Sequence, residues 1–521
     1  MSIDPLKESI TEIYIAVNGC SAIFGPMSKS SYDHQLWRSL LSWLETKHGM
    51  KTDSEHLRVE CRNAPGSGKG LFLLKDCSRS SLLFKIPARA LINIKTLSPF
   101  YPAAVGPNGN LELSAVQMIS LHLLLHKPSD EDGSISLDPT FGPYISTMPR
   151  DFSSHPCWWL VKQRMGRTEV HEDRLLESLP PSVMRELKLL SEKFWKDWSA
   201  VCDYIRARPK ILQKATHRLT ADDLTSRAHP AVLDYLWAWL NVNTRCIHYR
   251  LSPSTSSPEN LTLCPILDFA NHRPGPSDII PTSNPYKLGG DFTFTASSEH
   301  ALRLEEGERD KEVFLRYGGH ANRVLFVEYG FVNLGNSEGV EGEGSGEVDV
   351  QDVVEDLVFG SADAEVVKRA RDVLELEGYW GDWTMHASPS PAHPSYRLIT
   401  ALRLFHCLEH GLASQHSLDG KAHTTADTLV EAWRRVIQGV AEQISDDNEA
   451  RWRTSVERVC QEVIRRAERS MKTVEQLSEL KVSDSTPEWF EWMQGNIRLL
   501  WREELEVATQ VSHSIQNDEE F

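Results

Sequence analysis

The sequence lacks the marks of several large classes of protein. It has no apolar run long enough to span a membrane, and it does not open with a basic stretch followed by an apolar core. We therefore expect neither a membrane anchor nor a secretory signal. Its nine cysteines are scattered and form no CxxC pair, which argues against a disulfide scaffold and a cysteine-ligated zinc cluster. The expectation is a soluble, metal-free protein of the reducing cytoplasm or nucleus.

The sequence also has fewer basic than acidic residues. The 521 residues include 56 Lys and Arg against 73 Asp and Glu, a formal net charge of −17. A chain this acidic is a poor general binder of nucleic acid or anionic membranes, but it can attract basic proteins. Its 40% hydrophobic and 25% charged residues are ordinary for globular proteins, so a core is expected. The length suggests two to four domains.

The glycine-rich segment GSGKG, residues 66–70, completes neither of two phosphate-binding motifs. A P-loop requires glycine where Asn63 stands and Ser or Thr where Gly70 stands. The dinucleotide-binding pattern requires glycine in place of Leu71. The surrounding residues predict two short strands joined by this turn. The glycines indicate either a plain hairpin or a place where the backbone approaches a ligand closely.

A second segment, CPILDFANH at 264–272, places Asp268, Asn271 and His272 after an apolar stretch. No further metal ligands lie nearby at matching spacing, and the chain has no GxSxG nucleophile elbow, so neither a metal centre nor a serine hydrolase is indicated. A turn whose Asx side chains bond the backbone is the plain alternative.

A third segment, residues 312–336, contains two Tyr-Gly pairs that begin at Tyr317 and Tyr329. Such tyrosines can be amphipathic rim residues. A tyrosine fixed at a strand end also offers a hydroxyl that can orient an amine.

Together these segments resemble the SET-domain protein methyltransferases, in particular the class of the plant Rubisco large-subunit methyltransferase. The similarity is carried, in order along residues 57–480, by GSGKGLFLLKDCSRSSLLFKIP, FGPYISTMP (with Met148 where the class has leucine), YLWAWLNVNTRC, CPILDFANH, EVFLRYGGHANRVLFVEYGFV, ALRLFHCLEHG and NEARWRTSVERVCQEVI. The first 55 residues are not covered, apart from a helix predicted at 34–48.

The resemblance implies an α+β fold: a SET domain of small sheets with a threaded (pseudoknot) closing segment and a helical insertion, followed by an all-α C-terminal domain. The expected divisions are a helical extension at 1–55, the SET domain at 56–335 with its insertion at about 125–255, an acidic Gly/Ser-rich linker at 336–355, and a helical substrate-binding-like domain at 356–521. The chain pattern also predicts strands in TLCPILDF, DFTFTAS, LRLEEGE and EVFLRYG, and an amphipathic helix at 111–126.

The activity implied by the resemblance is methyl transfer from S-adenosylmethionine to a protein lysine, with no metal. A neutral amine is required, although free lysine has a pKa of about 10.4, and a desolvated channel beside a sulfonium disfavours the ammonium form. Tyr317 is the expected catalytic residue. The expected cofactor-binding residues are Gly68, Gly70, Phe72, Arg245, Asp268, Asn271, His272, Tyr317, Tyr329 and Phe331.

The expected roles differ among these residues. The glycines and the backbone near Phe72 approach the cofactor, Asn271 and His272 bind its amino-acid and adenine portions, and Asp268 helps to hold that segment. Tyr329 and Phe331 line the wall of the lysine channel. Arg245 contacts the cofactor carboxylate, or alternatively forms a structural ion pair.

Two other functions stay open at this point. A protein-histidine methyltransferase fits the same fold, because fold alone does not decide the acceptor. A non-catalytic interaction protein that docks through its C-terminal domain is the second alternative. The expected partner is a protein substrate, histone or non-histone, bound by a monomer with no direct role for nucleic acid or membrane.

Overall fold

The computed structural model describes residues 28–521 except 65, 130–132, 216–219, 221–228, 283–287, 305–309, 334–345, 414–425 and 480–485. The part up to residue 333 consists of α2 (Ser28–His48), β1 (Val59–Ala64), β2 (Gly68–Leu73), β3 (Leu82–Ile86), η1 (Ala88–Ala90), α3 (Ile94–Leu97), β4 (Ala104–Gly106), β5 (Gly109–Leu111), α4 (Ala115–Leu125), α5 (Gly142–Ile145), α6 (Pro156–Arg164), α7 (Val170–Glu177), α8 (Pro181–Ala207), η2 (Pro209–Lys214), α9 (Ala231–Arg245), β6 (Ile247–His248), β7 (Leu261–Thr262), η4 (Leu267–Phe269), β8 (Ile279–Thr282), β9 (Phe292–Ala296), β10 (Glu312–Val313) and α10 (Asn322–Tyr329).

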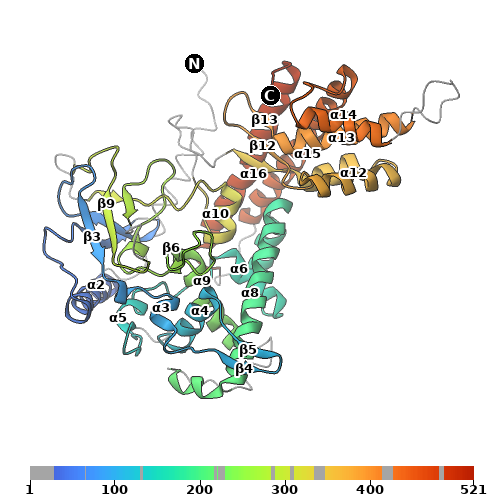
Figure 1. Ribbon diagram of the computed structural model, residues 1–521. Helices are drawn as coiled ribbons and strands as arrows, with labels where there is room; N and C mark the ends of the chain where they lie inside the picture. Colours follow the sequence, from blue (N-terminus) through green and yellow to red (C-terminus); the bar gives the residue numbers. More distant parts are fainter. Residues whose placement is uncertain are drawn as a thin grey trace.

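The remainder consists of β11 (Glu347–Asp349), α11 (Gln351–Val354), η5 (Glu355–Phe359), α12 (Ala364–Glu377), β12 (Thr384–His386), β13 (His393–Pro394), α13 (Tyr396–Ala413), α14 (Ala426–Ile437), α15 (Asp446–Glu479) and α16 (Phe490–Gln516). In Figure 1 strands β3 and β9 lie on the left and helices α12 to α15 at the upper right, with α10 and α16 between them. Among the described residues, none of the helices has the length and apolar character needed to cross a membrane.

Two three-stranded antiparallel sheets form the β portion. The first has the order β1-β2-β10, and the glycine-rich hairpin predicted from the sequence joins its first two strands, with Arg62 opposite Gly70. The second has the order β3-β9-β8. Phe84 and Phe294 stack across that pairing with ring centroids 4.7 Å apart. Aromatic cross-strand pairs of this kind stabilise short strands.

Strand predictions after residue 250 were only partly right. DFTFTAS forms β9, but TLCPILDF contributes only Thr262 to the two-residue β7 and an isolated bridge at Leu263. Ile266, whose φ of 70° is rare for a β-branched residue, then turns the chain into η4. EVFLRYG contributes only β10, and LRLEEGE forms an isolated bridge at Leu302, with residues 305–309 outside the described part.

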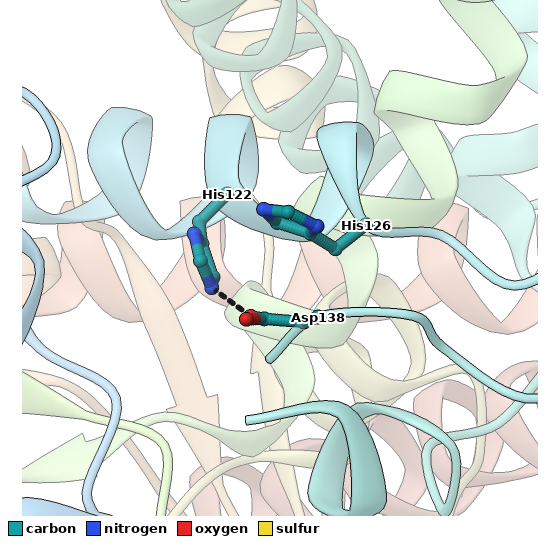
Figure 2. Close-up of side chains that lie close together, drawn as sticks. All are labelled: His122, His126 and Asp138. Atoms are coloured by element: carbon teal, nitrogen blue, oxygen red, sulfur yellow. Dashed lines mark hydrogen bonds and ion pairs between the residues drawn. The ribbon is translucent and has the colours of Figure 1, made fainter. Parts of the chain in front are cut away.

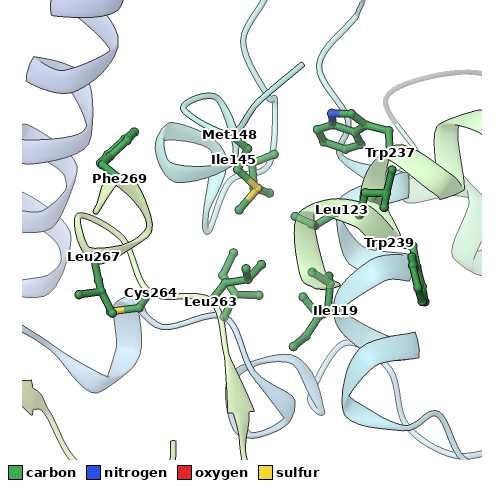
Figure 3. Packing of buried hydrophobic residues seen from close by; sticks show 14 of the residues in the cluster. Ile119, Leu123, Ile145, Met148, Trp237, Trp239, Leu263, Cys264, Leu267 and Phe269 are labelled. Atoms are coloured by element: carbon green, nitrogen blue, oxygen red, sulfur yellow. The ribbon is translucent and has the colours of Figure 1, made fainter. Parts of the chain in front are cut away.

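Helices α4, α8 and α9 form the helical core beside these sheets. Helix α4 was predicted to be amphipathic, but its buried residues include Ser120 and His122 as well as the leucines, so it is covered on all sides. Its neighbours α8 and α9 pack against it. Figure 3 shows Ile119 and Leu123 of α4 facing a cluster with Trp237 and Trp239 of α9 and with Leu263.

The C-terminal part is mainly helical, as expected, with α13 to α16 at the predicted positions. It also holds a three-stranded sheet, β11-β12-β13, which departs from the all-α expectation. Strand β11 and helix α11 lie within the segment 336–355 that was expected to be a linker, of which residues 336–345 lie outside the described part. Helix α16 contributes to two hydrophobic cores. Ile497 packs in the core of the N-terminal part, and Val511 packs in the core of the C-terminal part.

Candidate active site

Asn271 connects the glycine hairpin to the segment expected to contain the site. Its side-chain amide donates to the backbone oxygen of Lys69 at 3.0 Å and to Glu312 Oε1 at 2.6 Å. Burial raises the pKa of Glu312, and this hydrogen bond opposes the rise. A Cβ on Gly70 would lie well inside van der Waals contact of the Glu312 carboxylate, so glycine is required for that carboxylate to sit there.

Residues 312–317 pass between the hairpin and the Asn-His segment. Strand β10 pairs with β2, the backbone N–H of Leu315 donates to Asn271 O at 2.9 Å, and His272 bridges Leu315 in parallel. The backbone N–H of Tyr317 donates to His272 Nδ1 at 3.2 Å. This is the place that the resemblance predicts for the closing segment, and it brings Asn271, His272 and Tyr317 together.

Tyr317 lies with its hydroxyl in a fixed direction. The hydroxyl donates to the carbonyl oxygen of Ala270 at 2.9 Å. Burial is the main cause that raises the pKa of Tyr317 to about 12, so the phenol stays protonated at neutral pH. With its proton directed at Ala270, the hydroxyl oxygen keeps its lone pairs available to accept a hydrogen bond from an amine.

His272 is held as a neutral ring. Burial, followed by the charge of His320, lowers the pKa of His272 to about 4. A neutral imidazole can accept the Tyr317 N–H bond at Nδ1. Its ring lies 5.2 Å from that of Tyr317 and 5.9 Å from that of Phe331, so the histidine also forms part of an aromatic wall.

Arg245 and Asp268 form the polar end of the site. Arg245 Nη1 donates to the Asp268 carbonyl at 2.6 Å and lies 3.7 Å from the Asp268 carboxylate. The structural ion pair considered above is therefore present. Tyr144 donates its hydroxyl to the same carboxylate at 3.3 Å. Burial raises the pKa of Asp268 to about 6, because it outweighs the opposing effect of Arg245.

These groups meet at a cavity of about 270 Å³. It is lined by Thr244, Arg245, Cys246, Ile247, His248, Leu267, Asp268, Ala270, Pro281, Leu315, Arg316, Tyr317 and Tyr329. Of the predicted site residues, Arg245, Asp268, Tyr317 and Tyr329 line it. Tyr329 lies 5.1 Å from Tyr317, ring centroid to ring centroid.

The other predicted residues do not line this cavity. Asn271 and His272 lie directly behind it through the contacts described above, and Phe331 packs against Tyr329 with ring centroids 6.1 Å apart. Gly68 and Gly70 belong to the hairpin that Asn271 contacts, and Phe72 is buried in the same strand beneath Arg62.

Sequence reasoning missed Glu312, Ala270 and Tyr144. Glu312 lies five residues before Tyr317, inside the closing segment. Its spacing from Tyr317 indicates a place in the site once the pairing of β10 with β2 is known. Ala270 acts through its backbone, which no side-chain pattern reveals. Tyr144 comes from α5, within the segment that resembles the family's "P-Y" stretch, and only the three-dimensional packing places it beside Asp268.

The chain is similar in sequence and fold to several known proteins. No family model matches the chain. It is 23% identical over 486 residues to human SET domain-containing protein 4, covering 92% of this chain and 91% of that protein. It is 24% identical over 367 residues to Ribosomal lysine N-methyltransferase set11 of Schizosaccharomyces pombe, covering 70% and 74% of the two. The structure of Rubisco LSMT bound to AdoMet matches 93% of this chain and 92% of its own, with a TM-score of 0.55 at 18% identity.

The chain has the SET-domain methyltransferase fold. The resemblance drawn from the sequence is thereby confirmed, together with the combination of small sheets and a helical C-terminal part. A second structure of this SET fold, LSMT bound to Lysine and AdoHcy, has a TM-score of 0.54 and covers 94% of this chain and 92% of its own.

Proposed function

We propose that the protein is an S-adenosylmethionine-dependent protein-lysine N-methyltransferase whose active site is the cavity beside Tyr317. The observation that carries this proposal is the fixed hydroxyl of Tyr317, a residue that lines the cavity; the hydroxyl is protonated and bonded to Ala270. The relatives support the proposal, since two are named ribosomal lysine N-methyltransferases and the matched LSMT structures hold AdoMet, AdoHcy or lysine.

The cavity residues fit the amino-acid part of S-adenosylmethionine. Among the residues described, neither Arg245 Nε nor Asp268 Oδ1 has a hydrogen-bond partner, although both atoms are buried. A buried unpaired donor and acceptor are costly unless a ligand pairs with them. The cofactor's carboxylate and ammonium groups are complementary to this guanidinium and this carboxylate, in agreement with the role expected for Arg245.

When bound, S-adenosylmethionine supplies an electrophilic sulfonium methyl group. Tyr317 orients the incoming amine through its lone pairs, since its own proton is committed to Ala270. Leu267, Leu315 and Pro281 give the cavity apolar walls that exclude water and favour the neutral amine. His272 positions Tyr317 by accepting its backbone N–H, and Asn271 keeps the hairpin against this segment.

We further propose a basic protein as the substrate, bound by a monomer in the cytoplasm or nucleus. The net charge of −17 favours a basic partner, and the relatives include ribosomal enzymes. Ribosomal proteins and histones are therefore the substrate sets to compare. The likeness to Rubisco LSMT bound to Sinefungin and Monomethyllysine supports a protein lysine as the acceptor.

The test is methyl transfer from labelled S-adenosylmethionine to ribosomal proteins and histones, followed by mass spectrometry of the product residue. The wild-type protein should yield methyl-lysine. Tyr317→Phe should lower the turnover ~100-fold or more while cofactor binding changes little, because only the orienting hydroxyl is lost. Tyr396→Phe, at an exposed tyrosine, is the matched control. Methyl-histidine as the sole product, or full activity in Tyr317→Phe, would overturn the proposal.

A further inference from the structure

A buried group of two histidines and an aspartate lies away from the active-site cavity. His122 projects from α4, His126 is the C-cap of the same helix one turn later, and Asp138 precedes α5. The three residues are 2%, 8% and 6% exposed. Each offers a nitrogen or oxygen ligand atom, and these atoms all lie within 4.8 Å of one another. Figure 2 shows the three side chains converging from the helix and from the loop beneath it.

Two of the three side chains are held in place by further partners. His122 Nε2 lies 2.6 Å from Asp138 Oδ2, and His122 Nδ1 lies 2.8 Å from the Tyr101 hydroxyl. Asp138 Oδ1 accepts the backbone N–H of Thr140 at 2.8 Å. Metal-binding histidines usually have their second ring nitrogen hydrogen-bonded in this way, which fixes the ring and its tautomer.

His126 is the member that a hydrogen-bonded network does not explain. Its ring packs against that of His122, with centroids 4.7 Å apart, but it has no hydrogen-bond partner within the described part of the chain. Its ring nitrogens are therefore available as ligand atoms beside those of His122 and Asp138.

We propose that His122, His126 and Asp138 bind one divalent transition-metal ion of the zinc class. Two imidazoles and one carboxylate are the ligand types that zinc takes, whereas magnesium and calcium prefer oxygen ligands alone. The ion replaces the proton between His122 Nε2 and Asp138. His122 then carries its proton on Nδ1 and donates it to Tyr101. This revises the expectation of a metal-free protein, which rested on cysteine patterns, because the ligands here are nitrogen and oxygen.

The charges and contacts around the three residues suit a structural ion. Asp138 supplies the negative charge, and Lys214 is the cation that faces the site, over the rings of Phe100 and Tyr101. Phe100, 37% exposed, lies beside His122 with ring centroids 6.4 Å apart. The ion fastens α4 to the loop that leads into α5, which carries Tyr144 to Asp268.

The experiment measures metal binding and is independent of methyl transfer. Full-length protein is stripped with chelator and dialysed, then titrated with Zn²⁺ by calorimetry and with Co²⁺ by visible absorption. The wild type should bind one equivalent, with the absorption of a four-coordinate Co²⁺ site, and its melting temperature should rise. His126→Gln should weaken binding ~100-fold while changing the metal-free melting temperature little, since the His126 side chain makes none of these hydrogen bonds. His513→Gln, at an exposed histidine, should behave as wild type.

Asp138→Asn is the second variant, and it should also lose the ion. If it unfolds, the His126→Gln result still decides the question. Absence of binding in the wild type, or equal binding by wild type and His126→Gln, would show that the three side chains are only a polar network and overturn the proposal.

Discussion

The side-chain amide of Asn271 donates to the backbone oxygen of Lys69, a residue 202 positions earlier in the chain. The same nitrogen bonds Glu312, which lies 41 positions later. A single amide group therefore joins the hairpin, the Asn-His segment and the closing segment. Each of these segments is too short to be stable alone, so the position of the site depends on contacts between them.

Replacement of this amide tests its role in cofactor binding. Asn271→Ala removes both hydrogen bonds and leaves the partly buried Glu312 carboxylate without that donor, which typically costs ~1–3 kcal/mol. We expect S-adenosylmethionine to bind at least ~10-fold more weakly, measured by calorimetry. Asn110→Ala, at an exposed asparagine of β5, is the control. Unchanged affinity in Asn271→Ala would remove Asn271 from the site.

Gly70 provides a test of the same junction from the hairpin side. The methyl group of Gly70→Ala would displace the Glu312 carboxylate and so weaken its bond to Asn271. We expect a loss of cofactor affinity in the single variant and a partial recovery in Gly70→Ala combined with Glu312→Ala, because the clash is then absent. The coupling is read from a double-mutant cycle of binding constants. Additive effects would contradict the proposed contact.

Local sequence patterns predicted the segments that form the site better than the contacts between those segments. The glycine hairpin, the Asn-His segment and Tyr317 were all identified from residue types, since turns and strand ends have strong local signals. Glu312 was not, because β10 is only two residues long and its partner strand lies more than 200 residues away. A pattern within one segment carries no information about such a contact.

The helices also show that local patterns do not predict contacts between distant segments. The apolar run in α4 predicted a helix, but its burial on every side depends on α8 and α9, which only the folded chain brings together. In the same way, the positive φ of Ile266 prevents the strand predicted for TLCPILDF from continuing. This conformation could not be predicted from the residue type, since isoleucine rarely adopts it.

A pH dependence of stability is expected from Glu504. This partly buried residue of α16 accepts a hydrogen bond from Ser182 of α8 at 3.2 Å, and burial is the chief cause that raises its pKa to about 8. The folded protein therefore holds a proton that the unfolded chain releases near pH 4.5. The stability from this group is complete below that pH and falls by ~1.4 kcal/mol per unit as the pH rises towards 8.

Thermal melting between pH 5 and pH 8 measures this effect. Glu504→Gln removes the titrating group, so its melting temperature should fall less over this range than that of the wild type. Glu112→Gln, at an exposed glutamate, should follow the wild-type curve. A parallel decline in Glu504→Gln and wild type would show that Glu504 is ionised at neutral pH.

Helix α2 precedes the motifs that carry the family resemblance, and it supports the site directly. Trp37, 8% exposed, lies edge-on to Phe269 with ring centroids 5.9 Å apart, and Phe269 belongs to η4, just before Asn271. Asp33 of the same helix forms an ion pair with Lys69 at 3.0 Å. The helix therefore contacts both sides of the Asn271–Lys69 junction.

Trp37→Ala should consequently reduce stability and cofactor affinity together. Loss of a buried tryptophan costs ~3–5 kcal/mol, and the space it leaves allows Phe269 and the Asn271 segment to shift. Trp37→Phe keeps an aromatic ring against Phe269 and should retain most of the affinity. Calorimetric binding of S-adenosylmethionine, at a temperature where all variants are folded, separates the two effects. Wild-type affinity in folded Trp37→Ala would mean that α2 stabilises the domain without positioning the site.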